Sequence, residues 1–216
     1  MVMALRKDAV RDLYRERAGS YDIAANLYYL IGFREAKYRK MAISALRLKP
    51  GDTVVEIGCG TGLNFQYVLQ SIGRTGRLIG VDLTDAMLEK AKFRVEKNGW
   101  GNVQLVQSDA AKYAFSSGIN GIYSTFALTL IPEYEAIIER ASHALSDGGR
   151  FVVLDLRKPD RCPTWIIELG VAITKPFGVS LDLAERKPWE IMKKYFSNVT
   201  VTGIFGGFAY IAVGEK

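Results

Sequence analysis

The sequence predicts an α/β fold: a doubly wound, mostly parallel sheet with helices on both faces and an antiparallel C-terminal hairpin strand. Three observations support this. Strand-like and helical apolar patterns alternate along most of the chain, which is typical of parallel strands joined by helices. Three glycines, Gly58, Gly60 and Gly62, follow the first strand-like run, where such sheets bind ligands. The last two strand-like runs are joined by a Gly-Gly turn, which favours a hairpin.

The first 49 residues are predicted to form a basic helical cover, and residues 50–216 the main domain. Apolar residues recur at helical spacing over 5–17 and 23–47, and a Pro-Gly pair follows the second helix. The cover holds 11 basic and 5 acidic residues, which equals the net charge of +6 of the whole chain.

The concentration of positive charge raises the question of an anionic partner. A basic segment can bind lipid or nucleic acid, or it can be a solvated helix face. We expect an anionic membrane surface and no nucleic acid. The basic cover leads us to expect the protein at the inner membrane face. The two cysteines, Cys59 and Cys162, lack metal-site or disulfide spacing, so we expect no metal and a reduced, cytoplasmic protein.

The main domain alternates strands and helices in order. Strands are expected within residues 53–58, 76–83, 102–110, 118–128 and 150–156, and helices over 62–73, 85–99, 132–148 and 188–196. The runs 198–205 and 208–216 form the hairpin. With 49% hydrophobic residues in 216, the chain is long enough to bury one large core.

The glycine turn is expected to bind a nucleotide-like ligand, because a close ligand would exclude side chains there and the following helix offers free backbone N–H groups. Glu56 completes an E-x-G-x-G-x-G pattern. A nicotinamide dinucleotide fingerprint would need glycine where Leu63 stands. Asp82 ends the second strand, where it can accept hydrogen bonds from two ribose hydroxyls, and Asp109 ends the third, where it can accept from an exocyclic amine.

Five segments resemble the successive motifs of class I S-adenosylmethionine-dependent methyltransferases. They are VVEIGCGTG, GVDLTDAMLEKA, VQSDAAKYAF, GIYSTFALTLIP and ALSDGGRFVVLDL, in order and at normal spacing. The resemblance implies an enzyme with a seven-stranded sheet whose last strand is antiparallel. It also implies S-adenosyl-L-methionine as cofactor and S-adenosyl-L-homocysteine as product.

The resemblance also implies roles for residues at the motif positions. Glu56 is among the residues toward the cofactor. The others are Gly58, Gly60 and Thr61 at the methionine part, Asp82 at the ribose, Leu83, Met87, Asp109 and Ala110 at the adenine, and Thr125 near the reacting centre. The long connection 157–187 is apolar and is expected to be an insertion that lines the methyl-acceptor side.

Parts of the chain resemble two narrower groups of methyltransferases. SYDIAANLYYLIGFREAKYRKMAI and VVLDLRKP resemble methyltransferases of ubiquinone and menaquinone biosynthesis, but FALTLIP at 126–132 replaces their Phe-Gly-Leu-Arg-Asn stretch. RKPWEIMKKYF and GGFAYIAVG resemble small bacterial phosphatidylethanolamine N-methyltransferases. We therefore expect a phospholipid amine headgroup, such as that of phosphatidylethanolamine, as methyl acceptor.

The alternatives are C-methylation of a prenylated quinol, a soluble N- or O-methyl acceptor, and a non-catalytic cofactor-binding subunit. Carbon methylation of a quinol needs a general base, whereas an amine with a lowered pKa needs none. The catalytic candidates are Tyr21 in the cover and Asp155 at the end of the fifth strand. The single histidine, His143, lies on a helix outside the motif-bearing turns. The oligomeric state is not readable from the sequence.

Overall fold

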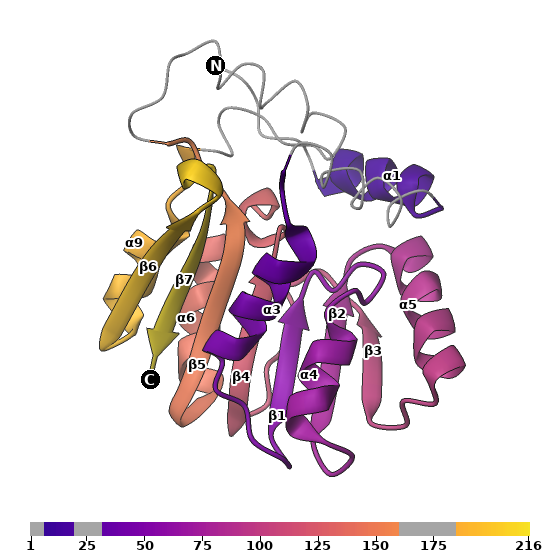
Figure 1. Cartoon of the computed structure of the whole chain (residues 1–216). Coiled ribbons are helices and arrows are strands. Elements are labelled where there is room, and N and C mark those ends of the chain that lie inside the picture. The colour runs from indigo at the N-terminus through magenta and orange to yellow at the C-terminus, as the bar shows by residue number, and fades with distance from the viewer. Residues whose placement is uncertain (1–6, 20–31, 160–184) are drawn as a thin grey trace.

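The computed structural model describes residues 7–19, 32–159 and 185–216. In this part of the chain, seven strands form one sheet in the order β3-β2-β1-β4-β5-β7-β6 (Figure 1). The strands are β1 (Thr53–Ile57), β2 (Arg77–Asp82), β3 (Val103–Gln107), β4 (Ile119–Thr125), β5 (Leu145–Leu156), β6 (Asn198–Ile204) and β7 (Ala209–Glu215). Strand β7 is antiparallel to both of its neighbours, and the other pairs are parallel. The predicted fold class is confirmed.

The described helices lie on both faces of the sheet (Figure 1). They are α1 (Lys7–Arg17), α3 (Glu35–Ala45), α4 (Phe65–Ile72), α5 (Asp85–Asn98), α6 (Tyr134–Ala144) and α9 (Pro188–Tyr195), with the 3-10 turns η2 (Leu128–Leu130) and η4 (Phe205–Gly207). Helices α3, α4 and α5 share one hydrophobic cluster, and α6 and α9 belong to the other. In the part of the chain described here, no helix combines the length and the apolar character that crossing a membrane requires.

Strands β1, β2, β4, β5 and β7 are mostly buried, whereas the edge strands β3 and β6 are more exposed. Burial on both faces explains the continuous apolar sequences of the central strands. Val54 and Val55 are neighbours in β1 and are both fully buried. Because successive side chains of a strand point to opposite faces, Val54 packs in the cluster of α3, α4 and α5, and Val55 in that of α6 and α9.

Several predicted boundaries differ from the structure. Of the helix predicted over 23–47, residues 23–31 lie outside the described residues. In the rest, Gly32 has a φ of 81°, and α3 begins only at Glu35. The helix predicted from residue 62 begins at Phe65, because the glycine turn extends through Gly62.

Another difference concerns β5, which begins at Leu145 and ends the preceding helix early, through a pairing of Leu145 with Ile119. Most of the predicted insertion 157–187 lies outside the described residues.

The N-terminal residues divide into two parts with different surroundings. Helix α3 belongs to the core, because its Ala42 and Ile43 are buried against the sheet. Helix α1 packs near α5, where the Arg15 guanidinium binds the Asp85 carboxylate through two hydrogen bonds of 2.8 and 3.0 Å.

The contact between α9 and the sheet depends on a missing side chain. Gly214 of β7 pairs with Phe151 of β5, and the Phe151 ring stacks on Phe196 with centroids 5.9 Å apart and planes 10° apart. A Cβ atom at position 214 would lie 2.7 Å from a ring carbon of Phe196. This packing therefore requires glycine at position 214.

We predict that Gly214→Ala lowers the free energy of unfolding by about 1–3 kcal/mol, because the Phe196 ring has to leave its stacked position. Urea denaturation measures the effect. Gly101→Ala is the matched control, because no heavy atom lies within 4 Å of its added Cβ, and it should change stability by about 0.5 kcal/mol or less. Equal stability of the two variants would contradict the packing argument.

Candidate functional site

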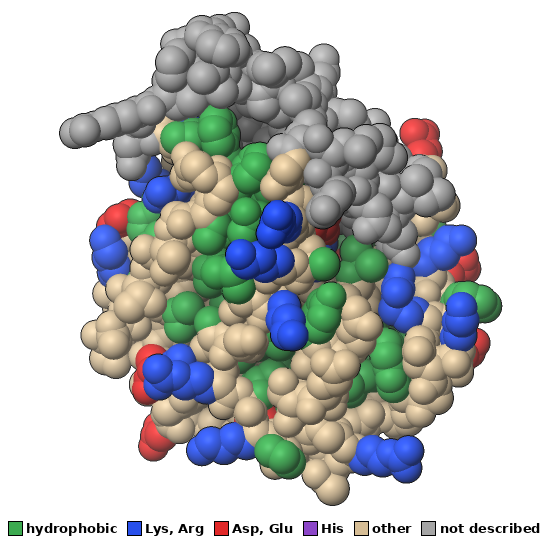
Figure 2. Space-filling model, in the orientation of Figure 1, with side chains coloured by type: hydrophobic (Ala, Val, Ile, Leu, Met, Phe, Trp, Pro, Cys, Tyr) green, Lys and Arg blue, Asp and Glu red, His purple; other side chains and the backbone are tan. Residues whose placement is uncertain are grey.

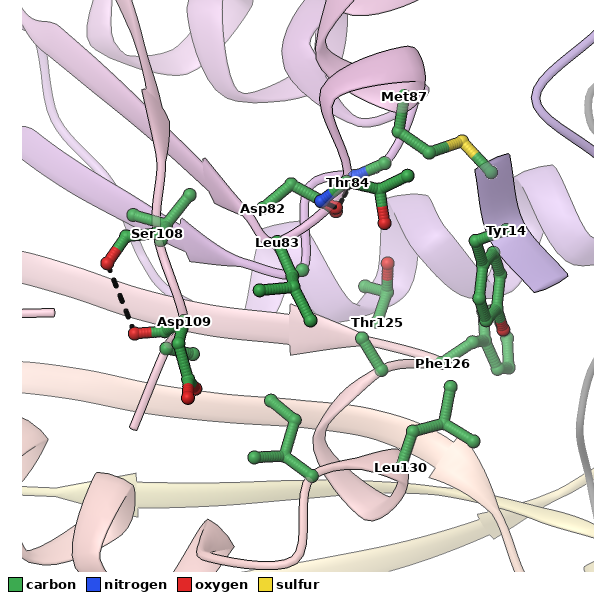
Figure 3. A pocket seen from close by; sticks show the side chains of 16 residues that line it. Tyr14, Asp82, Leu83, Thr84, Met87, Ser108, Asp109, Thr125, Phe126 and Leu130 are labelled. Atoms are coloured by element: carbon green, nitrogen blue, oxygen red, sulfur yellow. Dashed lines mark hydrogen bonds between the residues drawn. The ribbon is translucent and has the colours of Figure 1, made fainter. Parts of the chain in front are cut away.

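A pocket lies at the carboxyl ends of β1, β2, β3 and β4, where parallel sheets bind ligands (Figure 3). Its lining comes from α1, the glycine turn, the ends of β2 and β3, and the segment after β4. The lining residues are Tyr14, Gly58, Gly60, Val81, Asp82, Leu83, Thr84, Met87, Ser108, Asp109, Ala110, Thr125, Phe126, Ala127, Leu130 and Ile131.

Most of the residues predicted to bind the cofactor lie together in this lining. They are Gly58, Gly60, Asp82, Leu83, Met87, Asp109, Ala110 and Thr125. Glu56 and Thr61 were predicted with them but do not line this pocket, and both side chains are almost completely buried. The contacts of all ten with a cofactor stay a prediction.

The glycine turn has two kinds of glycine. Gly58, Gly60 and Gly62 all have positive φ angles, of 67°, 53° and 76°. A Cβ at Gly58 would lie 2.4 Å from the Cβ of Ala127, and one at Gly62 would lie 2.6 Å from the Phe65 ring. Only at Gly60, of these three, is the space open. The expectation that a ligand excludes side chains throughout the turn is therefore wrong for Gly58 and Gly62, where the protein's own atoms exclude them.

Asp82 links the glycine turn to the start of α5. One carboxylate oxygen accepts a hydrogen bond of 2.8 Å from the Gly60 N–H, and the other accepts one of 2.8 Å from the Thr84 N–H. Burial raises the pKa of Asp82, and these two hydrogen bonds oppose the rise. The Thr84 side chain and the Leu83 backbone also hydrogen-bond to this carboxylate, which lines the pocket at the end of β2.

Asp109 lies at the end of β3, on the same side of the pocket as Asp82 (Figure 3). One of its carboxylate oxygens accepts a hydrogen bond of 2.9 Å from the Ala111 N–H, and the Ser108 hydroxyl donates to its main-chain oxygen at 3.2 Å. The local turn thus fixes this carboxylate where the β3 end meets the pocket.

A buried polar network lies directly behind the pocket. The Glu56 carboxyl accepts hydrogen bonds from the Asn64 amide at 2.5 Å and from the Tyr123 hydroxyl at 2.6 Å. The Thr125 hydroxyl oxygen accepts from the Asn64 amide at 2.9 Å and from the Arg39 guanidinium at 2.6 Å. Burial raises the pKa of Glu56 to about 7, although the hydrogen bonds from Tyr123 and Asn64 and the charge of Arg39 lower it.

The residue after Thr125 has an unusual backbone conformation. Phe126 has a φ of 56°, which is uncommon for a non-glycine residue and recurs at functional sites. The Arg39 guanidinium lies 5.1 Å from the centroid of the Phe126 ring, and the Phe33 ring meets it edge-on at 5.9 Å. Helix α3 and its approach thus hold this part of the lining in place.

Of the two catalytic candidates, Tyr21 lies outside the described residues, and Asp155 does not line this pocket. Asp155 is 4% exposed and accepts hydrogen bonds from the Thr129 N–H, the Thr129 hydroxyl and the Leu156 N–H. Burial raises its pKa to about 6. Asp155 therefore lies outside this pocket, and its role as a catalytic residue stays a prediction.

Sequence reasoning missed Arg39, Asn64, Tyr123 and Tyr14. Asn64 could most easily have been found from the sequence, because it follows Gly62 by two residues. It holds the N-cap position of α4 but makes no capping hydrogen bond. Tyr123 is recognisable only once β4 is in register, with Tyr123 beside Glu56. Arg39 lies in the N-terminal segment 20–43, to which no site residue but Tyr21 was assigned, and Tyr14 belongs to no motif.

The chain is similar to known methyltransferases in sequence and in fold. The sequence model described as the ubiE/COQ5 methyltransferase family matches residues 2–166. Demethylmenaquinone methyltransferase of Staphylococcus saprophyticus is 30% identical over an alignment of 235 positions, gaps included. The alignment covers 98% of this chain and 97% of that protein.

Solved structures are similar in fold. A SAM-dependent methyltransferase from Aquifex aeolicus has a TM-score of 0.57 at 18% identity, over 82% of this chain and 88% of its own. Phosphoethanolamine N-methyltransferase 2 of Haemonchus contortus, in complex with S-adenosyl-L-methionine, has a TM-score of 0.60 at 22% identity, over 76% of this chain and 38% of its own.

We predict that Asp82→Asn weakens binding of S-adenosylhomocysteine by about 2–3 kcal/mol, because an amide donor replaces an oxygen that accepts charge-assisted hydrogen bonds. Isothermal titration calorimetry measures the affinity. Asp147→Asn, at an exposed position near the start of β5, is the control and should bind like the wild type. Unchanged affinity in a folded Asp82→Asn variant would remove Asp82 from the binding site.

A second prediction concerns pH. Between its ordinary pKa of 4.5 and its folded pKa of about 7, the Glu56 carboxyl keeps its proton in the folded chain and loses it in the unfolded chain. The unfolded state then binds fewer protons, so the free energy of unfolding falls as the pH rises. The full contribution is about 3 kcal/mol, and Asp155 adds a fall of the same sign toward its pKa of about 6.

In Glu56→Gln the first of these contributions is absent. Its free energy of unfolding, relative to wild type, should therefore increase between pH 4.5 and pH 8, by up to about 3 kcal/mol in urea denaturation. Glu89→Gln, at an exposed position of α5, should follow the wild-type curve. If the Glu56→Gln and wild-type curves run parallel, the pKa of Glu56 is not raised.

Proposed function

The chain belongs to the ubiE/COQ5 methyltransferase family, and we propose that it transfers a methyl group from S-adenosylmethionine to a ring carbon of a prenylated quinol. It is an S-adenosylmethionine-dependent methyltransferase, so the resemblance, the enzyme class and the cofactor predicted from the sequence are confirmed. The family and the demethylmenaquinone methyltransferase that matches along nearly its whole length support the quinol. They favour this alternative over the phospholipid headgroup expected from the sequence.

The pocket fits the cofactor. Carboxylates at the ends of β2 and β3, from Asp82 and Asp109, suit the hydroxyls and the amine of an adenosine. Apolar side chains of Leu83 and Met87 accompany them, as a stacked base requires. The open space above Gly60 admits a ligand close to the backbone. These residues would hold S-adenosylmethionine.

When bound, S-adenosylmethionine supplies a methyl group on a positively charged sulfur. The contribution of this chain is alignment and exclusion of water, since the transfer is a direct displacement. The side of the pocket formed after β4 is apolar, with Phe126, Leu130 and Ile131. Tyr14 of α1 also lines this pocket (Figure 3). These side chains would keep water from the reacting atoms.

A quinol must lose a hydroxyl proton for its ring carbon to attack. Asp155 has a pKa suited to taking up a proton near neutral pH, but its oxygens are bound by Thr129 and Leu156 behind η2. It therefore does not contact a substrate in the described pocket. Tyr21, in the segment between α1 and α3, stays the predicted base.

A prenylated acceptor resides in a membrane, so we also propose that the N-terminal part contacts an anionic membrane surface. Arg34, Lys37 and Lys40, at the start of α3, are exposed. Figure 2 shows Lys and Arg side chains over this helix. Each basic residue near an anionic surface contributes about 1 kcal/mol of attraction.

The experiment is transfer of a labelled methyl group by the full-length protein, with the methyl acceptor supplied in vesicles. We expect label on a demethylated menaquinol and none on phosphatidylethanolamine. The rate should be higher with anionic vesicles than with neutral ones and should fall as salt is added, because the attraction is electrostatic. Label on phosphatidylethanolamine alone would overturn the quinol, and equal rates on both vesicles would overturn the membrane contact.

A further inference from the structure

We propose that the Thr125 hydroxyl is fixed as a hydrogen-bond donor into the pocket and donates to the carboxylate of the amino-acid part of the cofactor. Arg39 and Asn64, which do not line the pocket, are the positioning residues that fix it. The inference rests on the proposed function, because it takes S-adenosylmethionine or its product as the ligand.

The Thr125 hydroxyl has one hydrogen to donate and two lone pairs that can accept hydrogen bonds. The Arg39 guanidinium donates to the Thr125 oxygen at 2.6 Å, and the Asn64 amide donates to the same oxygen at 2.9 Å. Both lone pairs are then occupied. A guanidinium has no acceptor, so the Arg39 bond has only one direction. The Thr125 hydroxyl can therefore take part in a further hydrogen bond only as a donor.

The orientation of the Asn64 amide is equally determined. Its oxygen accepts a hydrogen bond from Arg39 at 3.3 Å, and its nitrogen donates to Glu56 at 2.5 Å as well as to Thr125. A flipped amide would place its NH₂ group against the guanidinium and its oxygen against the carboxyl. The chain Arg39–Asn64–Glu56 thus allows one arrangement.

The free hydrogen has one direction left. Thr125 ends β4 and lines the pocket with Phe126 (Figure 3). Arg39, from α3, and Asn64, from the start of α4, do not line it. Among residues 7–19, 32–159 and 185–216, the Thr125 hydroxyl donates to no protein acceptor. Its hydrogen therefore points into the pocket.

The charges around the pocket indicate what it meets. Asp82 and Asp109 lie on the β2–β3 side, where they would repel an anion. On the Thr125 side, the buried Arg39 guanidinium, which also pairs with the Glu35 carboxylate, donates to the Thr125 oxygen. A hydroxyl whose oxygen accepts such a bond donates more strongly to an anionic oxygen. A ligand with a nucleoside at one end and a carboxylate at the other would place its carboxylate at Thr125.

The test compares two ligands that differ in the carboxylate. S-adenosylhomocysteine carries the amino-acid part, and 5′-methylthioadenosine lacks it. In Thr125→Val we expect the Kd of S-adenosylhomocysteine to rise at least tenfold, while that of 5′-methylthioadenosine changes less than twofold. Thr125→Ser, which keeps the hydroxyl, should recover most of the affinity. Thr202→Val, at an exposed position of β6, is the matched control.

Arg39→Met tests the positioning role and serves if Thr125→Val does not fold. It frees one lone pair, so the hydroxyl can turn away, and we expect a three- to tenfold loss for S-adenosylhomocysteine alone. The double variant should bind S-adenosylhomocysteine no worse than Thr125→Val does, because both changes remove the same interaction.

An equal loss for both ligands, or no loss for either, would overturn the inference while leaving the proposed function intact. A change confined to the KM of the methyl acceptor would also overturn it. Wild-type protein that binds neither ligand would contradict the proposed function itself.

Discussion

The carboxyl group of Glu56 joins the parts of the protein that shape the pocket. It lies at the end of β1, fully buried, and receives hydrogen bonds from Asn64 at the start of α4 and from Tyr123 on β4. Through Asn64 it is connected to Arg39 on α3. A buried carboxyl is unfavourable unless its lone pairs are satisfied, so each of these partners is held in one place. The position of Thr125, and with it one wall of the pocket, depends on this network.

The sequence was sufficient for the sheet and for the side of the pocket that follows β1, β2 and β3. There, a ligand-facing residue such as Asp82 or Asp109 ends a strand, and the strand itself is visible as an apolar run. Parallel strands bring such residues together without any knowledge of side-chain packing.

The rest of the site could not be predicted because it depends on contacts between distant segments. Arg39 reaches Thr125 across 86 positions, and Tyr123 reaches Glu56 across 67. Asp155 fits a catalytic pattern in the sequence, yet the turn η2 folds over it and Thr129 binds it. Only the packing of the turn shows that this carboxyl lies outside the described pocket.

The position of β7 has a consequence for how the protein is made. Residues 209–215 come latest of the described strands, but they lie between β5 and β6 and contribute to the hydrophobic clusters on both faces. Until a ribosome has released this segment, β5 has an unpaired edge and β6 has no partner in the sheet. The glycine turn and its pocket wall can form earlier, whereas completion of the described sheet waits for residues 209–215. A nascent chain is therefore exposed to wrong edge pairing for longest at β5, where chaperone binding is most useful.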